Sequence, residues 1–285
     1  MNATTPTASS RSPGPAALIT AAAFARVVQL GHVLQPGQTR NGTAPPYSHA
    51  RTNGFDESIG SVPGQSPDIR GVSDMISLGC HTGTHMDSLA HVSYQGLLFD
   101  GTKTSDPGVE DYFRGVVMNG QAENFRPIVA RGVLLDFTRY LGVERVGGDY
   151  VITPAAMAAC AASQDVTFGA GDVVLFRMGY DLVYRDPDEF LRMPIPGPDP
   201  DTARELVRAG VVATGSDTMP YEAAPGAEPM QVHAELIPKA GVFIFEMLDL
   251  RELSQQDARE FLFIALPLRI KGGTGSPINP VALVP

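Results

Sequence analysis

Three of the six histidines in this chain fall within one stretch of eleven residues, His81 to His91, together with the carboxylate of Asp87. Imidazole nitrogens and carboxylate oxygens are the ligands that Zn2+ prefers, and Mn2+ accepts them when carboxylates contribute. Because burying several titratable groups without a partner costs free energy, we expect a bound ion at their centre. The stretch therefore predicts a metal site, and the chain must fold so that these side chains converge.

The spacing within this stretch indicates how the side chains could meet. His85 and Asp87 are two residues apart and point to the same side of an extended segment, whereas Asp87 and His91 are four apart and share a face of a helix. Gly83 allows the tight turn that a close approach of His81 and His85 requires. We therefore expect a strand, a turn and a helix within the stretch.

The pattern H-x-G-T-H-x-D-x-x-x-H resembles the signature of the cyclase / bacterial kynurenine formamidase superfamily, which includes isatin hydrolase and polyketide cyclases. The resemblance implies that His81, His85 and Asp87 bind a divalent metal and that His91 is the catalytic acid/base. The formamidases usually have Pro two residues after the Asp, whereas this chain has Leu89. That difference leaves the metal site intact but weakens the inference that this chain shares the substrate of the formamidases.

A second stretch, from His233 to Glu246, resembles the other metal-binding segment of the family. Glu246 ends an apolar run over 242–245, where a carboxylate without a partner would be costly to bury. In the family the corresponding His and Glu join the bridging Asp around a second ion. The resemblance therefore implies one or two Zn2+ ions per chain, with Mn2+ as the alternative, and adds His233 and Glu246 to the ligands.

Three aromatic residues are candidates for substrate binding. Tyr47 and Phe55 lie in a segment rich in Gly, Pro and Asn over 31–74, which we expect to be irregular, and long loops of this kind are often functional. Tyr180 stands where the family usually has Trp, in a segment that resembles G-D-v-v-l-x-x-T-G-W, and the chain has no Trp at all. Because the formamidases hold a planar substrate with aromatic residues, this replacement argues against the same substrate.

Asp217 follows the apolar run 211–214 in a Gly-Ser-Asp-Thr segment that resembles the family's G-x-D loop. Asp side chains commonly accept backbone N–H groups at turns, so we interpret Asp217 as a structural residue. Contact with the metal site is the alternative.

Alternating apolar runs and helix signals predict a mixed α/β fold. Thr153 and Pro154 form a helix start, with an N-cap and a proline at the first helical position. Residues 1–23 are rich in Thr, Ser, Ala and Pro and are predicted to be a flexible tail, leaving a single domain over 24–285. The resemblance implies a swivelling β/β/α fold whose small barrel-like sheet carries the metals. The expected strands are 75–78, 129–137, 173–177, 211–214, 242–245 and 261–270, and the expected helices 154–162 and 202–209.

Bulk composition excludes several classes of partner. The net charge of -10 and the pI near 5.0 argue against nucleic acids and anionic membrane surfaces, which need clustered Lys and Arg. No apolar stretch reaches the roughly twenty residues that span a bilayer. The two cysteines, Cys80 and Cys160, form no ligand pair and indicate a reducing, cytoplasmic location. We expect a small-molecule substrate, and the resemblance implies a homodimer or homotetramer.

These features favour a metal-dependent hydrolase of a small amide, formamide, lactam or lactone. The metal would convert water to hydroxide, which attacks the carbonyl, while His91 transfers the proton. The alternative is a cyclase or dehydratase, a lyase that acts on a polyketide-like carbonyl compound. A non-catalytic metal-binding protein is a third hypothesis, against which the additional His91 argues.

Overall fold

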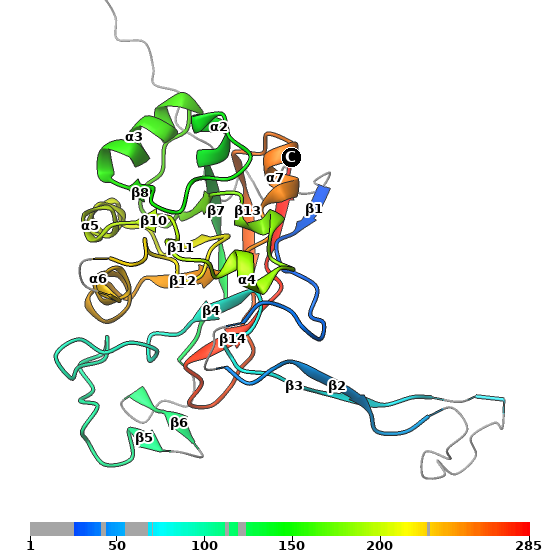
Figure 1. The fold of residues 1–285 in the computed structure, drawn as a ribbon. Helices are drawn as coiled ribbons and strands as arrows, with labels where there is room; N and C mark the ends of the chain where they lie inside the picture. Colours follow the sequence, from blue (N-terminus) through cyan, green and yellow to red (C-terminus); the bar gives the residue numbers. More distant parts are fainter. Residues whose placement is uncertain are drawn as a thin grey trace, which may run out of the picture.

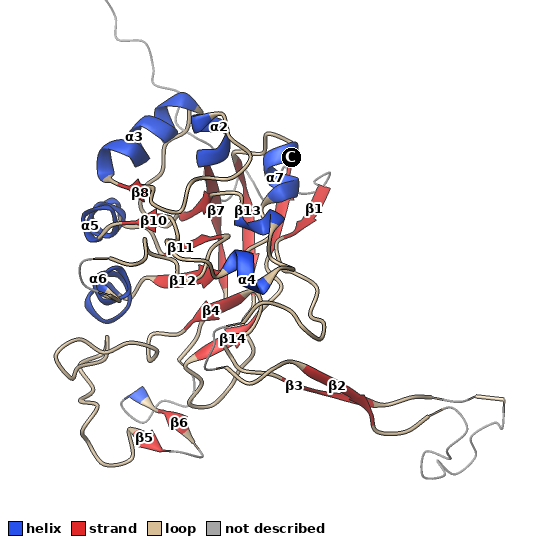
Figure 2. Ribbon diagram, viewed as in Figure 1, coloured by secondary structure: helices blue, strands red, loops and turns tan. Residues whose placement is uncertain are grey.

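The computed structural model describes residues 26–40, 44–54, 68–69, 71–111, 114–118, 124–226 and 229–285, so the predicted tail and Phe55 lie outside the described residues. A nine-stranded sheet forms the centre of the described fold (Figures 1 and 2). Its order is β1 (Arg26–Gln29), β15 (Val281–Val284), β13 (Glu260–Ala265), β7 (Ile128–Asp136), β9 (Val173–Arg177), β11 (Ala213–Ser216), β12 (Phe243–Glu246), β4 (His85–Asp87) and β14 (Gly275–Pro277).

The middle of the sheet is parallel and its flanks are antiparallel. β7, β9, β11 and β12 run in the same direction, whereas β4 pairs antiparallel with β12 on one side and with β14 on the other. Parallel strands buried on both faces read as continuous apolar runs, which is why β7 and β9 could be predicted from sequence. The sheet curls into a half-barrel, and separate apolar clusters lie on its two faces.

Helices cover one face of the sheet (Figure 1). α3 (Pro154–Ser163) contacts β7, α5 (Pro200–Ala209) lies between α3 and α6, and α6 (Gln231–Ala240) contacts β12. The Thr153 side chain accepts the N–H of Ala156, which confirms the predicted helix start. The shorter helical segments are α2 (Phe137–Leu141), η3 (Tyr180–Leu182), α4 (Pro187–Phe190) and α7 (Arg251–Gln255).

Three two-stranded sheets complete the described fold. β2 (Ser48–Arg51) and β3 (Asp74–Ser77) form an arm that projects from the body (Figure 2). Every residue of both strands is exposed, including Met75 and Ile76. The other two pairs are β5 (Glu110–Asp111) with β6 (Gly115–Val116), and β8 (Val151–Ile152) with β10 (Gly197–Pro198).

The structure confirms the mixed α/β, single-domain fold, and its curled sheet carries three of the candidate ligands, His85, Asp87 and Glu246. Two expectations are corrected. The segment over 31–74 is not wholly irregular, because it contains β2. The strand expected over 261–270 ends at Ala265, before Pro267, which has no N–H to donate to a ladder. No helix among the described residues is both long enough and apolar enough to cross a membrane.

Candidate metal centre

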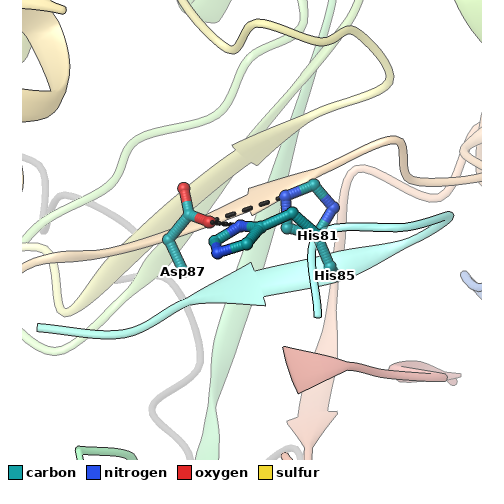
Figure 3. Close-up of side chains that lie close together, drawn as sticks. All are labelled: His81, His85 and Asp87. Atoms are coloured by element: carbon teal, nitrogen blue, oxygen red, sulfur yellow. Dashed lines mark ion pairs between the residues drawn. The ribbon is translucent and has the colours of Figure 1, made fainter. Parts of the chain in front are cut away.

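β4 brings the first group of side chains together. Because β4 is extended between two neighbouring strands, His85 and Asp87 point to the same side, as their spacing predicts. The preceding turn passes through Gly83, whose φ of 69° favours glycine, and this turn places His81 beside His85 and Asp87. Figure 3 shows the result: the Oδ1 atom of Asp87 lies 2.9 Å from His81 Nδ1 and 3.5 Å from His85 Nε2.

The helix predicted to carry His91 is absent from the structure, in which residues 88–91 form turns. The prediction was wrong because hydrogen bonding to β12 and β14 keeps Asp87 extended, and the chain then bends sharply. The N–H of His91 donates to the carbonyl of Ser88. This turn still brings the ring of His91 to 4.3 Å from that of His81 and 6.2 Å from that of His233, measured between centroids.

A second group of donors shares Asp87 with the first. His233 lies on α6, and its Nε2 atom is 3.6 Å from Asp87 Oδ2 and 3.5 Å from Glu246 Oε1. Glu246 ends β12, and its other oxygen lies 3.3 Å from His85 Nε2. One donor set is therefore His81, His85 and Asp87, and the other is Asp87, His233 and Glu246, with the donor atoms of each set within 4.8 Å of one another.

These groups fit a divalent metal. Asp87 is 1% exposed, and neither of its carboxylate oxygens has a hydrogen-bond partner of acceptable geometry. An unsatisfied buried carboxylate is costly, and the surrounding imidazole nitrogens and second carboxylate are the donors that such ions prefer. The two oxygens of Asp87 face different donor sets, as a carboxylate shared between two ions would.

The electrostatics keep both carboxylates ionised, which is their ligand form. Burial raises the pKa of Asp87, but at the acidic pH where this carboxyl group titrates the nearby imidazoles, chiefly His91 in its protonated form, outweigh this effect and hold that pKa well below its ordinary value. Burial likewise opposes ionisation of Glu246, while hydrogen bonds from His233 and His85 lower its pKa to about 2. Burial lowers the pKa of His91 to about 4, so its imidazole is neutral at pH 7 and able to accept a proton.

A cavity of about 710 Å³ opens onto these side chains, and His81, His85, His91, His233 and Glu246 all line it. Two of the predicted substrate-binding residues, Tyr47 and Tyr180, are not among the described residues that line the cavity. Tyr180 is 4% exposed, packs edge-on against Phe190 and is not among the described lining residues. Tyr47 is half-buried and does not line the cavity either, although its neighbour Pro45 does.

The putative cyclase family model matches residues 28–223 of this chain. The chain belongs to this family. It is 29% identical to isatin hydrolase of Roseibium aggregatum over 215 residues, which are 73% of each protein. Among solved structures, isatin hydrolase A of Ralstonia solanacearum matches with a TM-score of 0.69 and 25% identity over the whole of both chains. A novel cyclase matches with a TM-score of 0.82 and 24% identity, covering 94% of this chain and 90% of the other.

The structure of this cyclase-family chain also reveals Glu222, which the sequence did not single out. Its Oε2 atom lies 2.6 Å from Nδ1 of His233 and accepts the backbone N–H of the same residue at 3.1 Å. With Nδ1 bound in this way, the other ring nitrogen is left to face Asp87 and Glu246. Glu222 therefore positions a candidate ligand, although a lone Glu eleven residues before a His carries no recognisable sequence signal.

Replacement of this carboxylate should weaken metal binding. We expect Glu222→Ala to reduce affinity roughly ten- to a hundredfold, because outer partners of metal-bound histidines carry effects of that size. Isothermal titration calorimetry of the metal-free protein with Zn2+ or Mn2+ measures this affinity. Glu222→Gln should restore part of the affinity, and Glu205→Ala, at a half-buried residue that pairs with Arg208, is the control. Equal affinities in all variants would show that Glu222 does not position His233.

Gly275 in β14 is a glycine near the C-terminus that lies against the metal centre. It is the register partner of Asp87, and a Cβ added there would lie 2.5 Å from Cε1 of the His81 ring. Gly275→Ala should displace that ring and weaken metal binding by about tenfold, the smaller of the effects seen when support for a ligand is lost. Titration of the metal-free variant checks this. Gly169→Ala is the matched control, because no atom lies within 4 Å of its added Cβ and its φ, like that of Gly275, is not positive.

Proposed function

We propose that this chain is a metal-dependent hydrolase that cleaves the carbonyl–nitrogen or carbonyl–oxygen bond of a small amide, formamide, lactam or lactone. The observation that carries the proposal is the pair of three-donor groups sharing Asp87, with His91 beside them on the wall of a large cavity. The similarity to isatin hydrolase supports the same reaction class. Zn2+ and Mn2+ both suit three imidazoles and two carboxylates, and either one or two ions could occupy the site.

In the proposed reaction, different residues of the chain bind the metal and transfer the proton. His81, His85, Asp87, His233 and Glu246 would hold the metal. When bound, a divalent ion supplies Lewis acidity, which polarises a carbonyl group and makes a water molecule more acidic. The neutral imidazole of His91 accepts the proton from the attacking water and returns it to the leaving nitrogen or oxygen.

The variant His91→Ala tests whether His91 transfers the proton without binding the metal. We expect turnover to fall by about 10²- to 10⁴-fold, the usual contribution of a positioned acid/base, while metal content is unchanged. Hydrolysis of a panel of formamides and lactones, paired with elemental analysis of the same samples, measures both quantities. Full activity in the variant would remove His91 from the mechanism, and loss of metal would make it a ligand instead.

A lyase is the second candidate, and the family's description as putative cyclases favours it. In such a reaction His91 would remove a proton from the carbon next to a carbonyl group. The products distinguish the two reactions, because hydrolysis adds the atoms of water to the substrate and cyclisation does not. Mass spectrometry of the products in H2(18)O decides between them: incorporated oxygen supports the hydrolase, and its absence from a turned-over product supports the lyase.

The exposed arm supports a proposal that the chain is a homodimer or homotetramer. β2 and β3 leave apolar side chains such as Met75 and Ile76 in contact with solvent, each 56% exposed. A projecting edge of this kind is suited to contact with another copy of the chain. Sedimentation of the full chain tests the proposal: an assembly that dissociates on Ile76→Lys supports it, and a monomer at all concentrations contradicts it.

A further inference from the structure

The described residues that line the cavity beside the metal centre are of two kinds. His81, His85, His91, His233 and Glu246 form its polar end, and a second group, the aliphatic wall, consists of Leu191, Met193, Ile195, Met219 and Met230. These five residues come from three segments: the connection between α4 and β10, the turn after β11, and the start of α6. Because separate segments converge on one wall, we interpret it as a binding surface for the body of the substrate.

The chemistry of this wall favours an aliphatic partner. Apart from the imidazoles, no aromatic ring occurs among the described residues that line the cavity. A flat aromatic substrate gains from stacked or edge-on ring contacts, and the nearby Tyr180 and Tyr184 instead pack against Phe190 in the core. Methionine side chains are flexible and fill irregular shapes, so a wall with three of them suits a bulky, non-planar group.

The charge of the cavity adds a second constraint. Neither Lys nor Arg is present among its described lining residues. A carboxylate on the body of the substrate, away from the metal ligands, would lose its hydration without gaining a cationic side chain among these residues, which is costly. The volume of about 710 Å³ lies within the range of sites for drug-sized ligands, so it has room for a body larger than two fused rings.

We propose that the substrate is an amide, lactam or lactone with a bulky, uncharged aliphatic body, rather than a planar aromatic compound or one whose body carries a carboxylate. This inference rests on the proposed hydrolase function and makes it more specific. The aliphatic wall would bind the body, and the carbonyl group would then face the metal ligands and His91.

Two matched pairs of compounds test the proposal on the full chain with Zn2+ or Mn2+ supplied. N-(cyclohexylmethyl)formamide and N-benzylformamide differ in ring shape, and N-formylleucinamide and N-formylleucine differ in charge. We expect the first member of each pair to be preferred about tenfold in kcat/KM, a usual discrimination for an apolar pocket. Calorimetry with His91→Ala measures the same preferences as binding affinities, independently of turnover.

A variant that adds a positive charge to the cavity lining provides a second test. Met193 is 56% exposed and lines the cavity, so Met193→Arg should fold and offer a cation to a carboxylate. We expect it to shift the preference toward N-formylleucine by about tenfold in binding, as a bidentate ion pair would. The control is Leu182→Arg, at a residue that is 51% exposed and outside the cavity lining.

The possible outcomes distinguish the inference about the substrate from the proposed hydrolase function on which it rests. Binding preferences as expected without hydrolysis of any compound would support the substrate class and refute the hydrolase. Hydrolysis with equal or reversed preferences would overturn the substrate class and leave the hydrolase standing. Failure to bind any of the four compounds would overturn the substrate class as well.

Discussion

Asp87→Asn is expected to remove metal from both donor groups and to reduce turnover below detection. Both three-donor groups include Asp87, and its two oxygens face different partners. Asn removes the negative charge that both groups share and puts an amide nitrogen, which does not bind metal, in place of one donor oxygen. Thermal unfolding provides a second readout. Metal at a hundred times its Kd should stabilise the native protein by about 2.7 kcal/mol by mass action, and the variant should gain nothing.

The exposed Asp188→Asn is the matched control, because it makes the same chemical change far from the ligands. It should bind metal and respond to it as the native chain does. An Asp87→Asn protein that keeps its full metal content, or that is still stabilised by added metal, would contradict the ligand assignment.

The second large effect concerns stability. Asp217 is fully buried and accepts the backbone N–H groups of Met178, Gly179, Tyr180 and Asp181 at 2.7–3.4 Å. Each buried donor left without an acceptor costs about 1–3 kcal/mol, so Asp217→Ala should lower the free energy of unfolding by at least about 3 kcal/mol. For a chain of this size that corresponds to a fall in Tm of roughly 6 to 12 °C.

Asp201→Ala is the control for this prediction. Asp201 is exposed and pairs with Arg204 at the surface, and such pairs contribute at most about 1 kcal/mol. Differential scanning calorimetry of the two variants in the presence of metal compares them. A fall in Tm for Asp217→Ala no larger than that of the control would show that the turn after β9 does not depend on this carboxylate.

The same carboxylate illustrates what local sequence can predict. An Asp after an apolar run indicates a turn that needs a backbone acceptor, and Asp217 fills this role, as expected. Its partners lie about forty positions earlier in the chain, at the end of the neighbouring parallel strand, and sequence spacing could not identify them. Local polarity thus predicts the type of contact, and the topology of the sheet decides the partner.

At the metal centre, too, local sequence predicts some contacts and distant parts of the chain decide the others. The two-residue spacing of His85 and Asp87 predicts their shared side because alternation is a local property of extended chains. The helix expected for His91 did not form, because pairing of β4 with two distant strands determines the backbone there. Glu222 could not have been anticipated either, since its contact with His233 exists only once α6 has docked on the sheet.

The prediction for Tyr180 depended on its position in a family pattern, and the predictions for Tyr47 and Phe55 on the composition of their segment, rather than on a physical constraint. Tyr180 does follow β9 as the pattern suggests, but the chain turns there into η3 and buries the ring against Phe190. The cavity wall is instead supplied by methionine and aliphatic residues from segments with no distinctive sequence pattern.

Metal content of the purified native chain tests the central claim most directly. Elemental mass spectrometry after dialysis against trace Zn2+ or Mn2+ should find one or two equivalents of a divalent ion per chain. Asp87→Asn prepared in parallel should hold none. A native chain that retains no metal with either ion would contradict the metal centre and, with it, the proposed hydrolysis.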